Sequence, residues 1–182
     1  MIERAKKFVA DKHLKPSDEQ RYGGKPYTFH TDMVAGFAKK YLYYIEDKNK
    51  DNVIVAAHGH DLLEDTDTTQ RDLVIIFNAV VADIIFRVTD ERGFDKKEML
   101  FKTLPKIWQS HLATYVKLCD RMANGTNSKN ENSDKGRRMF IRYKKQYPIF
   151  RYALRQKLDN GHIQFENMWS ELDEIFEWKQ WN

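Results

Sequence analysis

The 182-residue chain contains one cysteine, Cys119, so it can form neither an internal disulfide nor a zinc site built from several cysteines. Long apolar runs are also missing. The longest, from Leu73 to Phe86, is interrupted by two polar residues and is too short to span a bilayer. The first twelve residues, MIERAKKFVADK, are charged throughout and match neither a signal peptide nor a lipidation motif. These absences predict a protein of the reducing cytoplasm with no membrane partner.

Proline and glycine are scarce, with 4 and 8 residues respectively, and strands with alternating polarity are not evident. Apolar residues instead recur at spacings of three and four, which is typical of amphipathic helices. Two clear series are Val34, Phe37, Ala38, Tyr41, Leu42, Ile45 and Phe165, Met168, Trp169, Leu172, Ile175, Phe176. We therefore predict that residues 1–182 form a single all-α domain, a bundle of roughly eight helices of about 10–14 residues each.

Polar segments suggest where these helices end. Pro16 to Pro26 is expected to be a loop, and Glu46 to Asn52 a charged turn. Thr66 to Thr68 offers an N-cap for a following helix. Gly125 to Ser133, with the sequence GTNSKNENS, is expected to be a polar connection.

The formal charge of +4 and the pI near 9.0 hide an uneven distribution. Lys135 to Lys157 contains nine basic and no acidic residues, so the other segments together hold 22 basic and 27 acidic residues, a net charge of −5. This basic tract has three interpretations: the solvated faces of two helices that meet near Pro148, an electrostatic funnel for a polyanionic small molecule, or a nucleic-acid surface. Its aromatic residues favour the last, but their spacing of three and four is also that of a helix core face, so nucleic acid is the least favoured partner.

The most informative predicted helix runs from Val53 to Asp65. After an apolar stripe that includes Ala56, the same face continues with His60, Asp61 and Glu64, where an amphipathic helix should place apolar residues. Buried ionisable groups need a partner or a metal, because burying one without a partner costs on the order of several kcal/mol of free energy. The alternative is a helix that simply reaches the surface at its C-terminal end.

Two further segments strengthen the first interpretation. In KLCDRMAN, Lys117, Asp120 and Asn124 fall on one helical face. In RYGGKPYTFH, Arg21 precedes His30 by nine residues.

Taken in order, RYGGKPYTFH, AAHGHDLLEDTDTT and VKLCDRMAN resemble the hydrolase signature of the RelA/SpoT-type alarmone hydrolases, a branch of the HD-domain metal-dependent phosphohydrolases. The resemblance covers about residues 18–127, and the chain length is similar to that of the small stand-alone members such as the metazoan SpoT homologue. It implies an HD-type helical bundle.

The resemblance also implies a metal site. His30, His60, Asp61 and Asp120 correspond to the metal ligands of the family, the H…HD…D set. Two imidazoles and two carboxylates form a mixed nitrogen and oxygen site that suits Mn²⁺ and, less selectively, Fe or Zn.

The remaining correspondences concern catalysis and the substrate. Glu64 and Asp65 match the acidic pair that is implied to orient and deprotonate the attacking water. Arg21 corresponds to a residue that stacks on the nucleotide base, whereas Asn124 and Tyr143 correspond to residues that contact the rest of the substrate.

The chain departs from the family pattern at several positions. His58-Gly59 replaces the usual two apolar residues before the His-Asp pair, and Ala123 and Gly125 to Asn127 differ from the usual sequence around Asn124. His58 lies on a different helical face from His60, so we expect a structural or polar-surface role for it. His13 matches no family residue and is expected at the surface or at a helix end.

The resemblance implies hydrolysis of the 3′-diphosphate of guanosine alarmones, (p)ppGpp, with release of pyrophosphate. Two alternative enzymatic activities are hydrolysis of adenosine alarmones and removal of the 2′-phosphate of NADPH. A third alternative, from another class of protein, is a non-catalytic nucleotide-sensing or partner-binding module. The expected partner is a phosphorylated nucleotide, and a homo-oligomer is left open.

Overall fold

The computed structural model of the protein describes residues 1–13, 21–22, 25–159 and 161–179. Within them lie helices α1 (Ile2–His13), α2 (Thr28–Lys40), η1 (Leu42–Tyr44), η2 (Asp47–Asn49), α3 (Lys50–Gly59), α4 (Leu62–Asp65), α5 (Gln70–Ile76), α6 (Ala79–Val88), α7 (Lys96–Trp108), α8 (His111–Asn130), α9 (Asp134–Leu154) and α10 (Glu166–Ile175), and strands β1 (Arg21–Tyr22) and β2 (Lys25–Pro26). The all-α prediction is confirmed, apart from the small antiparallel ribbon that β1 and β2 form.

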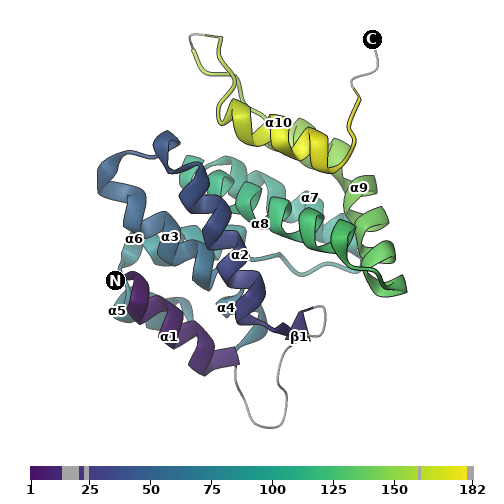
Figure 1. Ribbon diagram of the computed structural model, residues 1–182. Coiled ribbons are helices and arrows are strands. Elements are labelled where there is room, and N and C mark those ends of the chain that lie inside the picture. Colours follow the sequence, from purple (N-terminus) through teal and green to yellow (C-terminus); the bar gives the residue numbers. More distant parts are fainter. Residues whose placement is uncertain (14–20, 23–24, 160, 180–182) are drawn as a thin grey trace.

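Helix α8 is the centre of the bundle. It packs against α2, α3, α6, α7, α9 and α10, so almost all of its sides face other helices (Figure 1). Its sequence fits this position, because Leu112, Tyr115, Val116, Leu118 and Met122 are all buried. A helix that is enclosed in this way also buries the polar residues on its remaining faces, and the functional residues of the chain depend on this property.

Helices α2, α3 and α6 pack against one side of α8, with α1, α4 and α5 packed on them in turn, and α9 and α10 pack against α8 elsewhere (Figure 1). The described part of the chain contains ten α-helices where roughly eight were predicted, because the region from residue 50 to residue 88 is divided into four short ones. Thr69 caps α5 through a capping box with Asp72, and Asn78 caps α6 by accepting a hydrogen bond from Val81 N. The predicted cap at Thr66 to Thr68 therefore lies just ahead of the observed one, and the predicted turn at Glu46 to Asn52 contains η2 and the start of α3.

The predicted continuous helix from Val53 to Asp65 is interrupted. Helix α3 ends at Gly59, and α4 begins at Leu62 after a corner made of His60 and Asp61. A Cβ atom on Gly59 would lie 3.0 Å from Leu62 Cδ1 and 3.1 Å from Ile85 Cδ1, so the missing side chain lets the corner pack closely on α6. The corner departs only slightly from helical geometry, with φ −58° and ψ −31° at His60 and φ −96° and ψ 2° at Asp61, so the helical spacing of the sequence continues across it.

The expected connection from Gly125 to Ser133 is also wrong, because α8 continues as far as Asn130. Tertiary packing overrides the weak helix propensity of this polar segment. Helix α10 lies so close that a Cβ atom on Gly125 would be 2.7 Å from Ile175 Cγ2 and 2.8 Å from Phe176 Cζ. Ser128 Oγ additionally donates to the carbonyl of Asn124 at 2.6 Å.

The basic tract lies on one helix, α9, as far as Leu154 and not on two helices that meet at Pro148, and its last three residues follow that helix. A proline inside a helix removes one backbone hydrogen bond. Here its neighbours Tyr147 and Phe150 are fully buried, and their packing keeps the helix continuous across it. Among the described residues, no helix has the length and apolar character needed to cross a membrane.

The contact at Gly125 can be tested against a second helical glycine. We expect Gly125→Ala to lower the free energy of unfolding by about 1–3 kcal/mol, because the added methyl group overpacks the contact with Phe176. Gly36→Ala, where a Cβ meets nothing within 4 Å, should instead raise it by about 1 kcal/mol. Urea unfolding measures both, and equal shifts in the two variants would contradict the packing argument.

Candidate metal centre

Three buried side chains from three different helical regions meet at the centre of the bundle. His30 comes from α2, His60 from the corner after α3, and Asp120 from the middle of α8. One potential ligand atom from each lies within 4.8 Å of the others. The two Nε2 atoms are 3.2 Å apart, and Asp120 Oδ1 lies 3.4 Å from His30 Nε2 and 3.5 Å from His60 Nε2.

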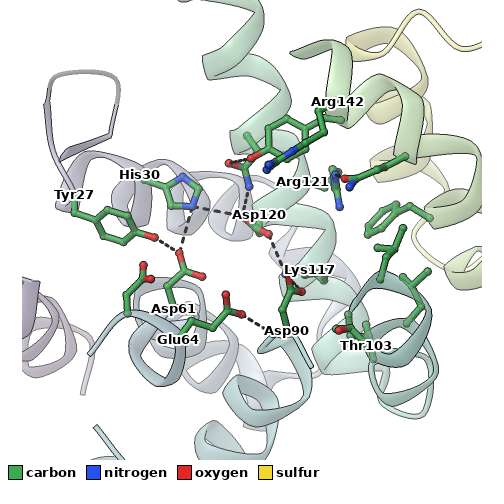
Figure 2. A pocket seen from close by; sticks show the side chains of 18 residues that line it. Tyr27, His30, Asp61, Glu64, Asp90, Thr103, Lys117, Asp120, Arg121 and Arg142 are labelled. Atoms are coloured by element: carbon green, nitrogen blue, oxygen red, sulfur yellow. Dashed lines mark hydrogen bonds and ion pairs between the residues drawn. The ribbon is translucent and has the colours of Figure 1, made fainter. Parts of the chain in front are cut away.

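Asp61 lies beside this group. Its Oδ2 atom is 3.0 Å from His60 Nε2 and 3.8 Å from His30 Nε2 (Figure 2 shows Asp61 with His30). Ligand atoms about 2.1 Å from one cation are separated from each other by roughly 3.0–3.4 Å, which is close to these spacings. The group could therefore hold a divalent cation.

Contacts outside the group orient its members. His60 Nδ1 lies 2.9 Å from the carbonyl of Ala57, which can only accept a hydrogen bond, so Nδ1 carries a hydrogen and Nε2 faces the group. Tyr27, at the start of α2, donates its hydroxyl hydrogen to Asp61 Oδ2. The ring of Tyr27 stacks on His13, 4.5 Å between centroids, and His13 is buried at the end of α1 rather than exposed.

Asp120 is held from both directions along α8. Asn124, one turn later, donates from Nδ2 to Asp120 Oδ1 at 2.5 Å. Lys117, one turn earlier, lies 3.4 Å from Asp120 Oδ2 and donates to the carbonyl of Val88 at 3.1 Å. The prediction that Lys117, Asp120 and Asn124 share one face of a helix is confirmed by these contacts.

The charges of the group reinforce one another. Burial raises the pKa of Asp120, but the nearby Lys117 ammonium and the two imidazoles outweigh it and hold that pKa well below its usual range. Burial likewise lowers the pKa of His60, but Asp61 and Asp120 bring it well above its usual range. The pocket thus strongly favours positive charge beside its carboxylates, which a proton on His60 supplies here and a metal cation could supply equally well.

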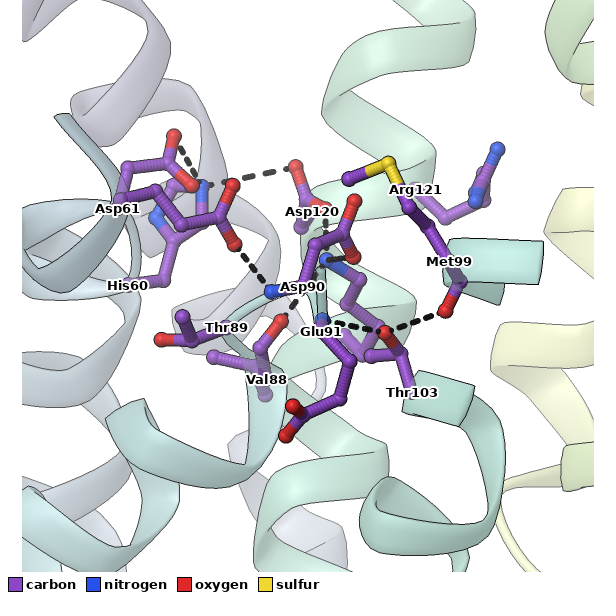
Figure 3. Close-up of polar contacts among 12 residues, drawn as sticks. His60, Asp61, Val88, Thr89, Asp90, Glu91, Met99, Thr103, Asp120 and Arg121 are labelled. Carbon is purple, nitrogen blue, oxygen red and sulfur yellow. Dashed lines mark hydrogen bonds and ion pairs between the residues drawn. The ribbon is translucent and has the colours of Figure 1, made fainter. Parts of the chain in front are cut away.

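The acidic pair Glu64 and Asp65 lies on α4, immediately after the corner. Glu64 lines the same pocket as Asp61, and Asp90 N donates to Glu64 Oε1 at 2.6 Å (Figures 2 and 3). Burial, with repulsion from Asp61, raises the pKa of Glu64 to about 7. Burial and Asp61 also raise the pKa of Asp65. Glu64 can therefore accept and release a proton near neutral pH.

The segment that follows α6 holds Glu64 in place. Glu91 N donates to Thr103 Oγ1 at 2.9 Å, and Thr103 Oγ1 donates to the carbonyl of Met99 on α7 at 2.7 Å (Figure 3). These bonds fix the backbone of Asp90 between α4 and α7. Nothing in the sequence pattern around Asp90 had marked it, because its contribution to the site is a backbone N–H group.

The pocket has a volume of about 260 Å³ and extends from these acidic residues to α9. Tyr143 lines it and donates from its hydroxyl to Asn124 Oδ1 at 3.3 Å, so two predicted substrate contacts lie together. The side chain of Arg21, the third, is outside the described part of the chain. Two arginines that had not been selected, Arg121 and Arg142, line the α9 side of the pocket (Figure 2).

The basic tract is divided among different roles. Arg142 lines the pocket, whereas Lys144 pairs with Glu177 at 2.6 Å and Arg151 with Asp173 at 2.9 Å. These two pairs hold α9 against the C-terminal segment. His58 also lies apart from the metal-ligand group. It is buried, its Nδ1 atom is 3.6 Å from Asp32 Oδ1, and burial lowers its pKa to about 4.

The helical fold brings His30, His60, Asp61 and Asp120 together, as the resemblance to the HD-type hydrolases implies. The described residues match a solved structure of a metazoan orthologue of SpoT with a TM-score of 0.71 at 24% identity, over 97% of this chain and 93% of the other. This likeness confirms the predicted HD-type bundle.

Sequence comparison gives named relatives. The chain is 36% identical to the guanosine-3′,5′-bis(diphosphate) 3′-pyrophosphohydrolase MESH1 of Danio rerio over 118 residues, which are 64% of this chain and 63% of that protein. It is also 36% identical to the guanosine-3′,5′-bis(diphosphate) 3′-pyrophosphohydrolase of Aquifex aeolicus over 131 residues, 68% of this chain and 17% of the other. The matched part thus spans less than two thirds of each relative. No protein-family model matches the chain. The resemblance to RelA/SpoT-type hydrolases is confirmed by these relatives.

The metal can be tested without an activity assay. We expect Mn²⁺ at one hundred times its Kd to raise the free energy of unfolding by about 2.7 kcal/mol, because only the folded chain assembles the donor group. Asp61→Asn should remove most of this stabilisation, whereas Asp51→Asn, on the exposed side of α3, should keep it. Thermal unfolding with and without Mn²⁺ measures the effect, and an Asp61→Asn response equal to that of the unmodified protein would exclude Asp61 as a ligand.

The hydroxyl of Tyr27 provides a separate test. We expect Tyr27→Phe to weaken Mn²⁺ binding about 10–100-fold, because Asp61 loses the hydrogen bond that orients it. Tyr152→Phe, at a side chain that is 92% exposed, is the matched control. Calorimetric titration with Mn²⁺ compares the two, and equal affinities in both variants would rule out an orienting role for Tyr27.

Proposed function

We propose that this protein is a metal-dependent hydrolase that removes the 3′-diphosphate of guanosine alarmones and releases pyrophosphate. The observation that carries the proposal is the presence of Glu64, with its raised pKa, in the pocket that His30, Asp61 and Asp120 also line. A non-catalytic nucleotide-binding module needs no proton acceptor beside its metal ligands. The names of the curated relatives, which are 3′-pyrophosphohydrolases, support the reaction.

Four residues would hold the metal: His30, His60, Asp61 and Asp120. The donor set, two imidazole nitrogens and two carboxylates, fits Mn²⁺, and Fe or Zn fit it less selectively. A divalent cation bound there would lower the pKa of water and stabilise the charge that develops on the phosphoryl oxygens.

The protein's own groups then handle the proton. In the proposed reaction Glu64, assisted by Asp65, accepts a proton from the attacking water. The water oxygen bonds to the phosphorus atom attached to the 3′ oxygen, the bond between that phosphorus and the 3′ oxygen breaks, and pyrophosphate leaves. The 3′ oxygen takes up a proton and becomes a hydroxyl group on the remaining nucleotide. The hydrogen bond from Asp90 N keeps the Glu64 carboxylate oriented throughout.

Other residues position the nucleotide. Asn124 and Tyr143, joined by their hydrogen bond, are proposed to contact its sugar and phosphates, and Arg21 to stack on its base. The burial of the free thiol of Cys119 is compatible with the cytoplasmic location that we propose for this reaction.

Glu64→Gln tests the proton acceptor. Because the amide cannot take a proton, we expect kcat to fall about 10²–10⁴-fold, while the affinity for Mn²⁺ stays within about threefold. In the unmodified protein kcat/KM should fall as the pH drops through the pKa of Glu64, which lies at about 7 without metal and lower with a cation beside it. The variant should lack this acid limb, and Glu166→Gln, on the exposed face of α10, should retain it. Full activity of Glu64→Gln would refute the assignment.

The substrate is tested with a panel of nucleotides in the presence of Mn²⁺. We expect pyrophosphate release from guanosine 3′,5′-bis(diphosphate) at a higher kcat/KM than for the adenosine analogue, and higher than phosphate release from NADPH. A preference for either of the other two compounds would replace the guanosine alarmone with that substrate. Binding of all three without turnover of any would instead support a sensor.

A further inference from the structure

The guanidinium of Arg121 is buried at the α9 side of the pocket. Arg121 follows Asp120 on α8, so its side chain leaves the helix toward α9 while Asp120 faces the imidazoles. Only 5% of Arg121 is exposed, yet it lines the pocket (Figure 2). A buried charge in a pocket wall is costly unless something in the pocket neutralises it.

One face of α9 holds this guanidinium rigidly. Its central carbon lies 5.1 Å from the ring centroid of Tyr143 and 4.7 Å from that of Phe150, and Nη1 donates to Gln146 Oε1 at 3.2 Å. These three residues are spaced three and four apart, so they project from the same side of the helix. The side chain is therefore set in one orientation before any ligand arrives, which lowers the entropic cost of binding.

No carboxylate among the described residues lies within 4.0 Å of the Arg121 guanidinium, and its buried Nε has no hydrogen-bond partner there. Lys117, on the same helix, shows the contrast, because it is buried and has Asp120 at 3.4 Å. The partners of Arg121 on α9 are two aromatic rings and a neutral amide. The protein thus supplies a fixed cation without a paired anion.

A second cation stands at the same side of the pocket. Arg142 is on α9, with its guanidinium carbon 5.2 Å from the Tyr143 ring, and it too lines the pocket without a carboxylate within 4.0 Å among the described residues. Figure 2 shows Arg142 and Arg121 on one side of the pocket, and Asp61 and Glu64 on the other, with Asp120 between them. The pocket therefore has an acidic half for a metal and a basic half for an anion.

We propose that Arg121 and Arg142 form a second anion subsite, which binds the phosphate groups on the 5′ side of the nucleotide while the 3′ phosphates lie at the metal centre. This inference rests on the proposed function, because it assigns the two halves of the pocket to the two phosphorylated positions of one substrate. Planar guanidinium groups suit this task, since they offer paired N–H donors to phosphate oxygens.

The subsite makes the enzyme select nucleotides that carry phosphates at both positions. A nucleotide with a 5′ hydroxyl leaves the buried Arg121 without an anionic partner. Its transition state therefore lacks the ion pair that a 5′ phosphate forms, and its kcat/KM is lower. A nucleotide with both groups neutralises each half of the pocket.

The experiment compares two substrates in the presence of Mn²⁺: guanosine 3′,5′-bis(diphosphate) and guanosine 3′-diphosphate with a free 5′ hydroxyl. The measured quantity is the ratio of their kcat/KM values. We expect Arg121→Gln to lower this ratio about 10–100-fold, the usual range for hydrogen bonds to charged groups, and Arg142→Gln to lower it about 3–10-fold because that side chain is exposed. Lys145→Gln removes the same charge from an exposed position of α9 outside the pocket lining, and should leave the ratio unchanged.

Gln146→Glu is a second variant that keeps Arg121. It places a carboxylate where the amide oxygen now lies, 3.2 Å from Arg121 Nη1, so the guanidinium acquires an internal counter-ion. We expect the ratio to fall as it does in Arg121→Gln, with the fold preserved by the new ion pair. If neither Gln146→Glu nor Arg142→Gln changes the ratio, the subsite is refuted even if Arg121→Gln fails to fold.

A binding measurement separates this inference from the proposed function. Guanosine 5′-diphosphate, which has no 3′ phosphate, should bind the unmodified protein about 10–100-fold more tightly than it binds Gln146→Glu, whether or not any substrate is turned over. If no substrate is turned over but the two proteins differ in affinity for guanosine 5′-diphosphate as expected, the proposed hydrolase activity is refuted and the anion subsite is supported. If the substrate is turned over but the two proteins bind guanosine 5′-diphosphate equally, and the ratio of kcat/KM values is unchanged, the hydrolase activity is supported and the subsite is refuted.

Discussion

The meeting of Asp120 with His30 and His60 is the constraint on which the rest of the structure depends. The three side chains come from α8, α2 and the corner after α3, so their spacing of 3.2–3.5 Å requires these elements to pack in one way. Each group is buried, and each has its charge or hydrogen bonding set by the others. A shift of any of the three elements would leave a buried ionisable group without its neighbours, and such a group is costly.

The central position of α8 explains how one helix serves two halves of the pocket. Asp120 faces the imidazoles, and Arg121, the next residue, faces α9. Successive residues on a helix point about 100° apart, so a helix enclosed on nearly all sides can present opposite charges to different neighbouring helices. The acidic site and the basic wall therefore share one rigid support, and their separation is set by the helix geometry rather than by a flexible loop.

The same enclosure accounts for the pKa of Glu64. Its carboxylate is partly desolvated in the pocket wall and lies close to Asp61, so the protonated form gains relative stability, while the N–H group of Asp90 keeps one oxygen in place. The segment that supplies this N–H is tied to α7 through Thr103. The orientation of the Glu64 carboxylate thus depends on helices that contribute no metal ligand.

Much of the fold was accessible from the sequence, because apolar spacing reports directly which face of a helix is buried. The relation of Lys117, Asp120 and Asn124 along one helix followed in the same way. The positions at which the helices end could not be predicted from the spacing of apolar residues. Gly125 looked like the start of a connection, and only its contact with α10 explains why α8 continues. His60 looked like part of a long helix, and only the approach of α6 to Gly59 explains the corner.

The sequence by itself determined that the chain is helical, and its three motifs identified which imidazoles and carboxylates to examine. Local spacing and residue type suffice for this, since both are properties of neighbouring residues. Only the tertiary structure decided which distant groups share the pocket. Tyr27, Asp90 and Arg121 act there through a hydroxyl group, a backbone N–H group and a buried guanidinium, each placed by contacts with other helices. A one-dimensional pattern contains no record of those contacts, because they form only when the helices pack together.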